Sequence, residues 1–152
     1  MPSSKIFLLF IIFLYSATPG AQPKYLSHNY SSNKTFAADS AFQSGRNTLL
    51  SALASNNAAD LKIHTIAVRG DTVYGLFMCR GDVGLATCHQ CVVNATQWLP
   101  SECPVSKEAI VWYDECLLRY SNHFFFSTVE TRPQVALSNT RNVSNLAHRQ
   151  AS

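Results

Sequence analysis

The sequence has few charged residues and no cluster of one sign. Lysine, arginine, aspartate and glutamate make up 14% of the 152 residues, and the formal net charge is +3. No basic stripe stands out, which argues against nucleic-acid binding. After the first 21 residues, no apolar run approaches the roughly 20 residues that a membrane-spanning helix needs. No segment repeats, so we expect one domain with one core.

The first 21 residues have the pattern of a secretory signal peptide. Lys5 precedes an unbroken apolar run from Ile6 to Tyr15, and small residues follow it up to Ala21. Ten apolar residues rise only about 15 Å as a helix, which is half of a bilayer core. We therefore expect residues 1–21 to be removed and the product to be soluble and secreted.

Four triplets fit the N-glycosylation pattern Asn-x-Ser/Thr, at Asn29, Asn33, Asn94 and Asn142. Behind a signal peptide, such sites are candidates for glycan attachment. Asn33 and Asn142 lie in polar segments and are the stronger candidates. Asn94 lies in an expected helix, where only a solvent-facing position could carry a glycan.

Periodicity and turn residues predict the order β-α-β-β-α-β-β for a domain over residues 22–130. The expected helices run from about 41 to 54, capped by Asp39 or Ser40, and from about 88 to 99, capped by Thr87 and ended by Pro100. The expected strands are 22–30, 63–68, 72–79, one long strand from 110 towards 120, and 124–126. Residues 131–152 lack apolar periodicity and are interpreted as a linker-like polar tail. An α+β domain, with helices on one face of an antiparallel sheet, is the expected packing.

The cysteine count is odd. Five cysteines follow the signal, at Cys79, Cys88, Cys91, Cys103 and Cys116. In an oxidising compartment cysteines tend to pair, so one should be left over, and the connectivity does not follow from the sequence alone.

Three other chemistries compete with a disulfide framework. A zinc site could use Cys88, Cys91 and either His89 or Cys79, but there is no second C-x2-C and an exported chain meets oxidising conditions. Cys88 and Cys91 have the spacing of a redox pair, yet other cysteines are close enough to claim both thiols. No local signature supports a Cys–His nucleophile. We favour the disulfide framework and expect no metal and no cofactor.

The cysteine spacing and its flanking residues together resemble one family. The C-x8-C-x2-C run is flanked by Phe42-Gln43, by Tyr74-Gly75-Leu76 and by the segment from Glu108 to Ser121 around the last cysteine. This combination is similar to the ginkbilobin-homologous domain of plant cysteine-rich repeat secretory proteins, cysteine-rich receptor-like kinase ectodomains and the antifungal seed protein ginkbilobin. The resemblance covers roughly residues 25–128. It implies two helices packed on a five-stranded antiparallel sheet, stapled by disulfides.

The resemblance also implies a disulfide pairing. The family has six cysteines, and its usual pairing corresponds here to Cys79–Cys88 and Cys91–Cys116. Cys103 would then lack its partner, whose expected position is Tyr30. Three fates for Cys103 are open: a buried and inert thiol, an intermolecular disulfide that links a dimer, or a reactive thiol.

The resemblance implies binding rather than catalysis. Ginkbilobin binds mannose through Asn, Arg and Glu, and their positions fall on Ser31, Ile110 and Ser121, none of which keeps the residue type. An apolar isoleucine cannot give the charge-assisted hydrogen bonds of an arginine, so we do not expect mannose binding through that site.

Our expected function is a secreted, non-enzymatic plant protein of the apoplast that acts in stress or defence by binding a carbohydrate or a cell-surface protein. The alternatives are an antifungal lectin-like protein and a truncated receptor-like kinase ectodomain. An enzyme is disfavoured, because Asp114 and Glu115 would point to opposite faces of a strand. Asp114, His123 and Glu130 form no recognisable constellation either.

Overall fold

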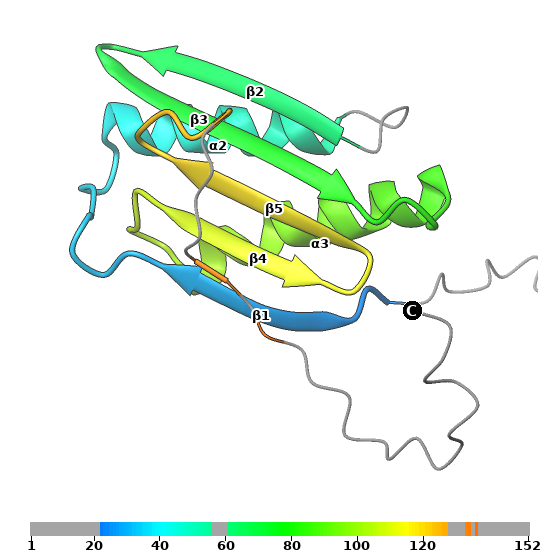
Figure 1. Ribbon diagram of the computed structural model, residues 1–152. Helices are drawn as coiled ribbons and strands as arrows, with labels where there is room; N and C mark the ends of the chain where they lie inside the picture. Colours follow the sequence, from blue (N-terminus) through cyan, green and yellow to red (C-terminus); the bar gives the residue numbers. More distant parts are fainter. Residues whose placement is uncertain (1–21, 56–60, 128–132, 135, 137–152) are drawn as a thin grey trace, which may run out of the picture.

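A computed structural model describes residues 22–55, 61–127, 133, 134 and 136. In this part of the chain, the helices α2 (Ala41–Ala54) and α3 (Leu85–Glu102) lie on one face of an antiparallel sheet (Figure 1). The strands are β1 (Tyr25–Tyr30), β2 (Leu61–Val68), β3 (Asp71–Cys79), β4 (Ala109–Tyr113) and β5 (Cys116–Ser121), in the spatial order β1-β4-β5-β3-β2. The predicted α+β class, two helices on a five-stranded antiparallel sheet, is confirmed.

Helix α2 begins and ends where its sequence predicts. Ser40 is the N-cap, and its hydroxyl oxygen accepts a hydrogen bond from the backbone N–H of Gln43 at 3.2 Å. The helix packs closely on β3, because a Cβ added to Gly75 would lie 2.5 Å from Cδ2 of Leu49. The missing side chain of Gly75 therefore sets how near α2 can approach the sheet.

Helix α3 is longer than predicted at both ends. It begins after Gly84, which makes no side-chain cap, and it passes through Pro100 to Glu102. The predicted boundaries at Thr87 and Pro100 are therefore wrong. Pro100 lies in the last turn, where its missing N–H removes only one backbone hydrogen bond. The N–H of Cys103 still closes the helix on the Leu99 carbonyl at 2.9 Å.

The predicted long strand from residue 110 towards 120 is wrong, because the chain reverses at Asp114 and Glu115 to form the β4–β5 hairpin. Contacts from distant segments hold this turn: the backbone N–H groups of Asp114 and Arg80 donate to the carbonyls of Lys24 and Glu115, each at 2.9 Å. The predicted strand at 124–126 is also wrong. The two errors offset each other, so the predicted number of strands agrees with the structure.

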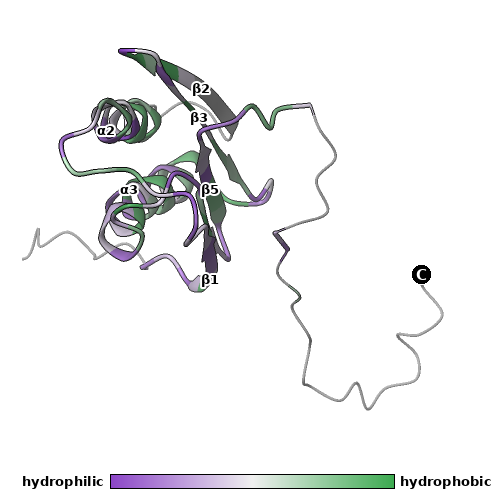
Figure 2. Ribbon diagram, turned by 90° about the vertical axis from the view of Figure 1, so that its left-hand side faces the viewer, coloured by the Kyte–Doolittle hydropathy of each residue, from purple (hydrophilic) through white to green (hydrophobic). Residues whose placement is uncertain are grey.

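The hydrophobic core lies between the helices and the sheet, as Figure 2 shows with both helices on the same side. Side chains with almost no exposure come from both helices and from the sheet. They are Phe42, Leu49 and Leu53 on α2, Val92 and Leu99 on α3, and Phe77, Val111, Leu118 and Tyr120 on the strands. The hydroxyl of Tyr120 donates to the Ser106 carbonyl at 2.9 Å. Burial raises the pKa of this phenol to about 12, so it stays a neutral donor.

Two disulfides tie α3 to the sheet at one end. Cys79–Cys88 joins the end of β3 to the first turn of α3, and Cys91–Cys116 joins α3 to the start of β5. These are the pairs that the family resemblance implies. They close loops with sequence separations of 9 and 25 residues. In the chain-entropy model each bridge contributes about 3 kcal/mol to stability.

Candidate functional site

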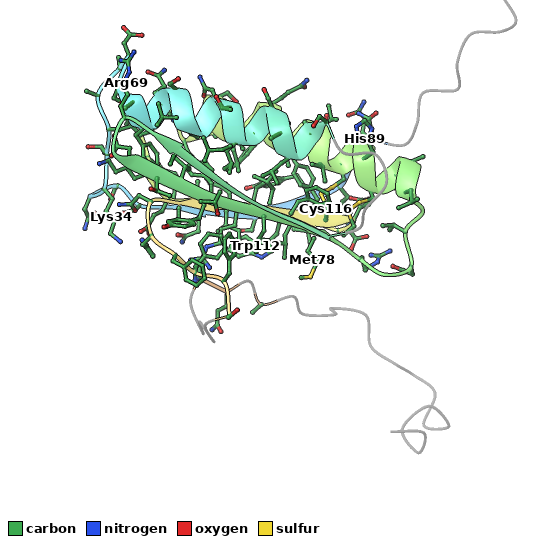
Figure 3. The ribbon with its side chains drawn as sticks, turned by 90° about the horizontal axis from the view of Figure 1, so that it is seen from above. Lys34, Arg69, Met78, His89, Trp112 and Cys116 are labelled. Atoms are coloured by element: carbon green, nitrogen blue, oxygen red, sulfur yellow. A yellow bond between two sulfur atoms is a disulfide. The ribbon has the colours of Figure 1, made fainter. Side chains whose placement is uncertain are left out.

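The sheet face opposite the helices carries the candidate site. Cross-strand partners share a face, and one row across this open face consists of Asn29, Ile110, Arg119 and Leu76. The next row contains Trp112, Leu117 and Met78. Figure 3 shows Trp112 and Met78 on the side of the sheet away from the helices. The open face therefore has a polar end near β1 and a more apolar region near Met78.

A hollow of about 260 Å³ lies at the polar end, and we call it the β1–β4 pocket. Its lining residues come from the end of β1, the start of β4, β5 and the C-terminal segment: Asn29, Tyr30, Ser31, Glu108, Ala109, Ile110, Arg119 and Pro133. The pocket thus brings together an amide, a carboxylate and a guanidinium over an apolar floor, a set of groups suited to a small polar ligand.

The charged groups of the β1–β4 pocket are held by neighbours. Glu108 Oε1 lies 2.6 Å from Lys34 Nζ and 2.8 Å from His123 Nδ1. Both pairs use the same carboxylate oxygen, Oε1 of Glu108. The guanidinium carbon of Arg119 lies 4.2 Å from the ring centroid of Phe125, which orients its N–H groups.

The three positions that the resemblance links to sugar binding do not all meet. Ser31 and Ile110 both line the β1–β4 pocket, whereas Ser121 is not among the lining residues and is fully buried. The Ser121 hydroxyl oxygen accepts from the backbone N–H of His123 at 3.2 Å. Sequence reasoning missed Glu108 and Arg119 as pocket residues. The alternation of Arg119 with buried Leu118 and Tyr120 is the signal that places it on the open face.

Ser121, His123 and Glu108 form a cluster that resembles a hydrolase triad by composition only. Ser121 Oγ lies 3.1 Å from His123 Nδ1, and Glu108 Oε1 lies 2.8 Å from the same nitrogen. A catalytic histidine needs its acid and its nucleophile on different ring nitrogens. With both groups on Nδ1 and Ser121 fully buried, this cluster cannot activate the serine for attack on a substrate.

Cys103 is free and buried, with 1% of its surface exposed. Burial, with a smaller contribution from the Glu102 charge, raises the pKa of the thiol to about 11. Arg46, a buried residue that sequence reasoning did not single out, donates to the carbonyls of Cys103 and Pro104 at 3.3 and 2.9 Å. The position Tyr30 lies on β1 and is 47% exposed. A neutral and inaccessible thiol is poorly placed for reaction or for linking two chains.

The remaining candidate residues take structural positions. Cys88 and Cys91 are disulfide-bonded, and His89 Nε2 lies 3.0 Å from the Ala54 carbonyl oxygen. Asp114 and Glu115 lie in the β4–β5 turn, so the prediction that they belong to a strand is wrong. Within the described ranges, no group of three potential metal ligands comes together. Glu130 and Asn142 lie outside the described residues.

The candidate glycosylation sites differ in their surroundings. Asn29 and Asn33 are exposed. Asn94 is half-buried on α3, where its amide nitrogen lies 3.5 Å from Gln22 Oε1.

None of the helices in the described segments has the length and apolar character to cross a membrane.

Known proteins are similar to this chain in sequence and in fold. Among curated sequences from Arabidopsis thaliana, the putative cysteine-rich repeat secretory protein 7 is 35% identical, over 90% of this chain and 48% of the relative. The cysteine-rich receptor-like protein kinase 25 is 37% identical, over 90% of this chain and 21% of the kinase. The chain therefore spans about half the length of the secretory relative and about a fifth of the kinase.

Solved structures agree with the fold. The crystal structure of the tandem DUF26 ectodomain of the Arabidopsis thaliana cysteine-rich receptor-like protein PDLP5 matches with a TM-score of 0.62 and 28% identity, over 67% of this chain and 52% of that one. The corresponding ectodomain of PDLP8 matches with a TM-score of 0.64 at 23% identity. The salt stress response/antifungal family model matches residues 28–123, more than half of the chain. The chain therefore belongs to the salt stress response/antifungal family of ginkbilobin-homologous (DUF26) domains.

Proposed function

We propose that the chain is a secreted, non-enzymatic binding domain that acts outside plant cells in stress or defence, and that its ligand is a carbohydrate bound in the β1–β4 pocket. The observation that carries this proposal is the lining of the pocket, where Asn29, Glu108 and Arg119 surround one hollow of about 260 Å³. Amide, carboxylate and guanidinium groups hydrogen-bond sugar hydroxyls well, because charged partners strengthen such bonds.

The residues suit a reversible ligand better than a reaction. Glu108 is shared between Lys34 and His123, and Arg119 lies over Phe125, so both charges are fixed before a ligand arrives. Such preorganised groups lower the ordering cost of binding. An extracellular location is supported by the two disulfides and by relatives that are named secretory proteins.

A second candidate function is protein binding through the apolar end of the open face. Met78 is 47% exposed, and together with Trp112 and Leu117 it borders a hollow of about 180 Å³. The secretory relatives are about twice as long as this chain, and the matched ectodomains are described as tandem domains. A second domain of the same kind, or a receptor on the cell surface, is the partner that this candidate function requires.

A matched pair of variants tests the leading proposal. We expect titration of the unglycosylated chain, made in a bacterial periplasm, against a panel of plant and fungal glycans to give saturable binding. Arg119→Gln should weaken this binding at least tenfold. Arg69→Gln, at an exposed residue away from the pocket, removes the same charge and should leave the affinity unchanged. Equal affinities for the two variants, with unchanged melting temperatures, would show that the pocket is not the binding site.

A further inference from the structure

One candidate glycosylation site forms a wall of the β1–β4 pocket. All three residues of the triplet Asn29-Tyr30-Ser31 line this pocket. Asn33 is not a lining residue, and Asn94 lies on α3 beside Gln22. Of the three candidate glycosylation sites in the described part of the chain, Asn29 is therefore the one that lines the β1–β4 pocket.

The side chain of Asn29 is free to carry a glycan. It is exposed and lies in the wall of the pocket. It lies on β1, which is an edge strand of the sheet, so no neighbouring strand within the described ranges crowds its outer side. An exposed side chain on the face of an edge strand can carry a bulky and soluble group without displacing the core.

The direction of the side chain decides where the first sugars lie. Asn29 and Ile110 are cross-strand partners, and Ile110 and Arg119 are partners in the next pair. All three therefore project from the same face of the sheet. A sugar joined to the Asn29 amide nitrogen starts at the wall of the pocket, beside Ile110 and near the charged groups of Arg119 and Glu108.

We propose that Asn29 is an N-glycosylation site and that its glycan folds over the β1–β4 pocket and covers it. The tether makes this contact effective even if each hydrogen bond is weak. A short flexible linkage gives an effective concentration in the millimolar range, so an attached sugar competes strongly with free ligands. The covering of the pocket is argued from the position of Asn29 in its wall, whereas a role of the glycan in limiting ligand access rests on the proposed function.

The test is labelling of the Glu108 carboxylate by a carbodiimide and an amine, read by peptide mass spectrometry. The full chain is secreted from plant cells as wild type, Asn29→Gln, Ser31→Ala and Asn33→Gln. The Glu108 side chain is 23% exposed without a glycan, whereas that of Asp82 is 69% exposed and serves as an internal reference. Asn29→Gln and Ser31→Ala both abolish the triplet, but Ser31→Ala keeps the asparagine, so each variant controls for a folding defect of the other.

We expect a glycopeptide at Asn29 in the wild type and labelling of Glu108 that rises severalfold in Asn29→Gln and Ser31→Ala but not in Asn33→Gln. The same four chains made in a bacterial periplasm, without glycans, should label alike. An unmodified Asn29 peptide, or equal Glu108 labelling with and without the glycan, would overturn the inference. Because labelling needs no ligand, failure of carbohydrate binding in the panel titration would leave this result standing and would count only against the proposed function.

Discussion

At the scale of single residues, the odd cysteine is explained by burial. Cys103 lies at the C-cap of α3 with 1% exposure, and Arg46 holds the carbonyls of Cys103 and Pro104 in place. A buried cation without an acidic partner among the described residues is stabilised here by carbonyl oxygens and by the Phe36 ring, 4.9 Å away. These contacts keep the surroundings of the thiol closed.

Alkylation of the native chain should therefore be slow. Burial disfavours the charged thiolate and raises the pKa of Cys103 from 9.0 to about 11. At pH 8 only about one thiol in a thousand is then ionised, before steric exclusion is considered. We expect iodoacetamide at pH 8 to leave Cys103 unmodified for hours, and to modify it fully once the chain is unfolded in denaturant. Rapid modification of the native chain, followed by intact mass, would show that the thiol is accessible.

Restoration of the missing cysteine should stabilise the domain. The family pairing places the partner of Cys103 at Tyr30, so Tyr30→Cys should form a third disulfide. Closure of this long loop is worth about 2–4 kcal/mol, which raises the melting temperature by roughly 10–20 °C for a domain of this size. Tyr30→Ser controls for loss of the ring. A bridge confirmed by mass spectrometry without a higher melting temperature would contradict the assignment of Tyr30.

At the scale of elements, the sequence predicted correctly those boundaries that neighbouring residues determine, and it failed where contacts between distant segments determine the structure. Ser40 caps α2 with its own side chain, and the sequence placed that helix correctly. The β4–β5 turn has no glycine or asparagine, and it is held by Lys24 and Arg80 from distant segments. The lining of the β1–β4 pocket was missed for the same reason, because Glu108 and Arg119 meet Asn29 only through strand register. The cysteine pairs were accessible through the family resemblance and not through local sequence.

The packing of α2 on β3 gives a prediction at this scale. Gly75→Ala puts a methyl group 2.5 Å from Cδ2 of Leu49, so the helix must shift or the leucine must change its rotamer. Overpacking of this kind typically costs about 1–3 kcal/mol of unfolding free energy. Gly81→Ala, where no atom lies within 4 Å of the added Cβ, should change it by less than about 0.5 kcal/mol. Equal midpoints of urea unfolding for the two variants would refute the close approach.

At the scale of the whole molecule, the stabilising contacts and the proposed binding pocket lie on opposite faces of the sheet. Both helices cover one face of the sheet (Figure 2), and both disulfides lie at one end of it. The open face has a polar pocket near β1 and an apolar region near Met78. Loops and edges on a rigid scaffold are where binding residues usually lie. The similar part makes up about half of the related secretory protein and about a fifth of the related receptor-like kinase.

The most direct test of the carbohydrate proposal is a map of the bound surface. The unglycosylated chain, isotope-labelled, is titrated with the glycan that binds best in the panel, and its backbone amide signals are followed by NMR. We expect the shifted signals to cluster at residues 29–31, 108–110 and 119, which line the β1–β4 pocket. Shifts that cluster instead at Met78, Trp112 and Leu117, or the absence of saturable shifts with any glycan, would contradict the proposal.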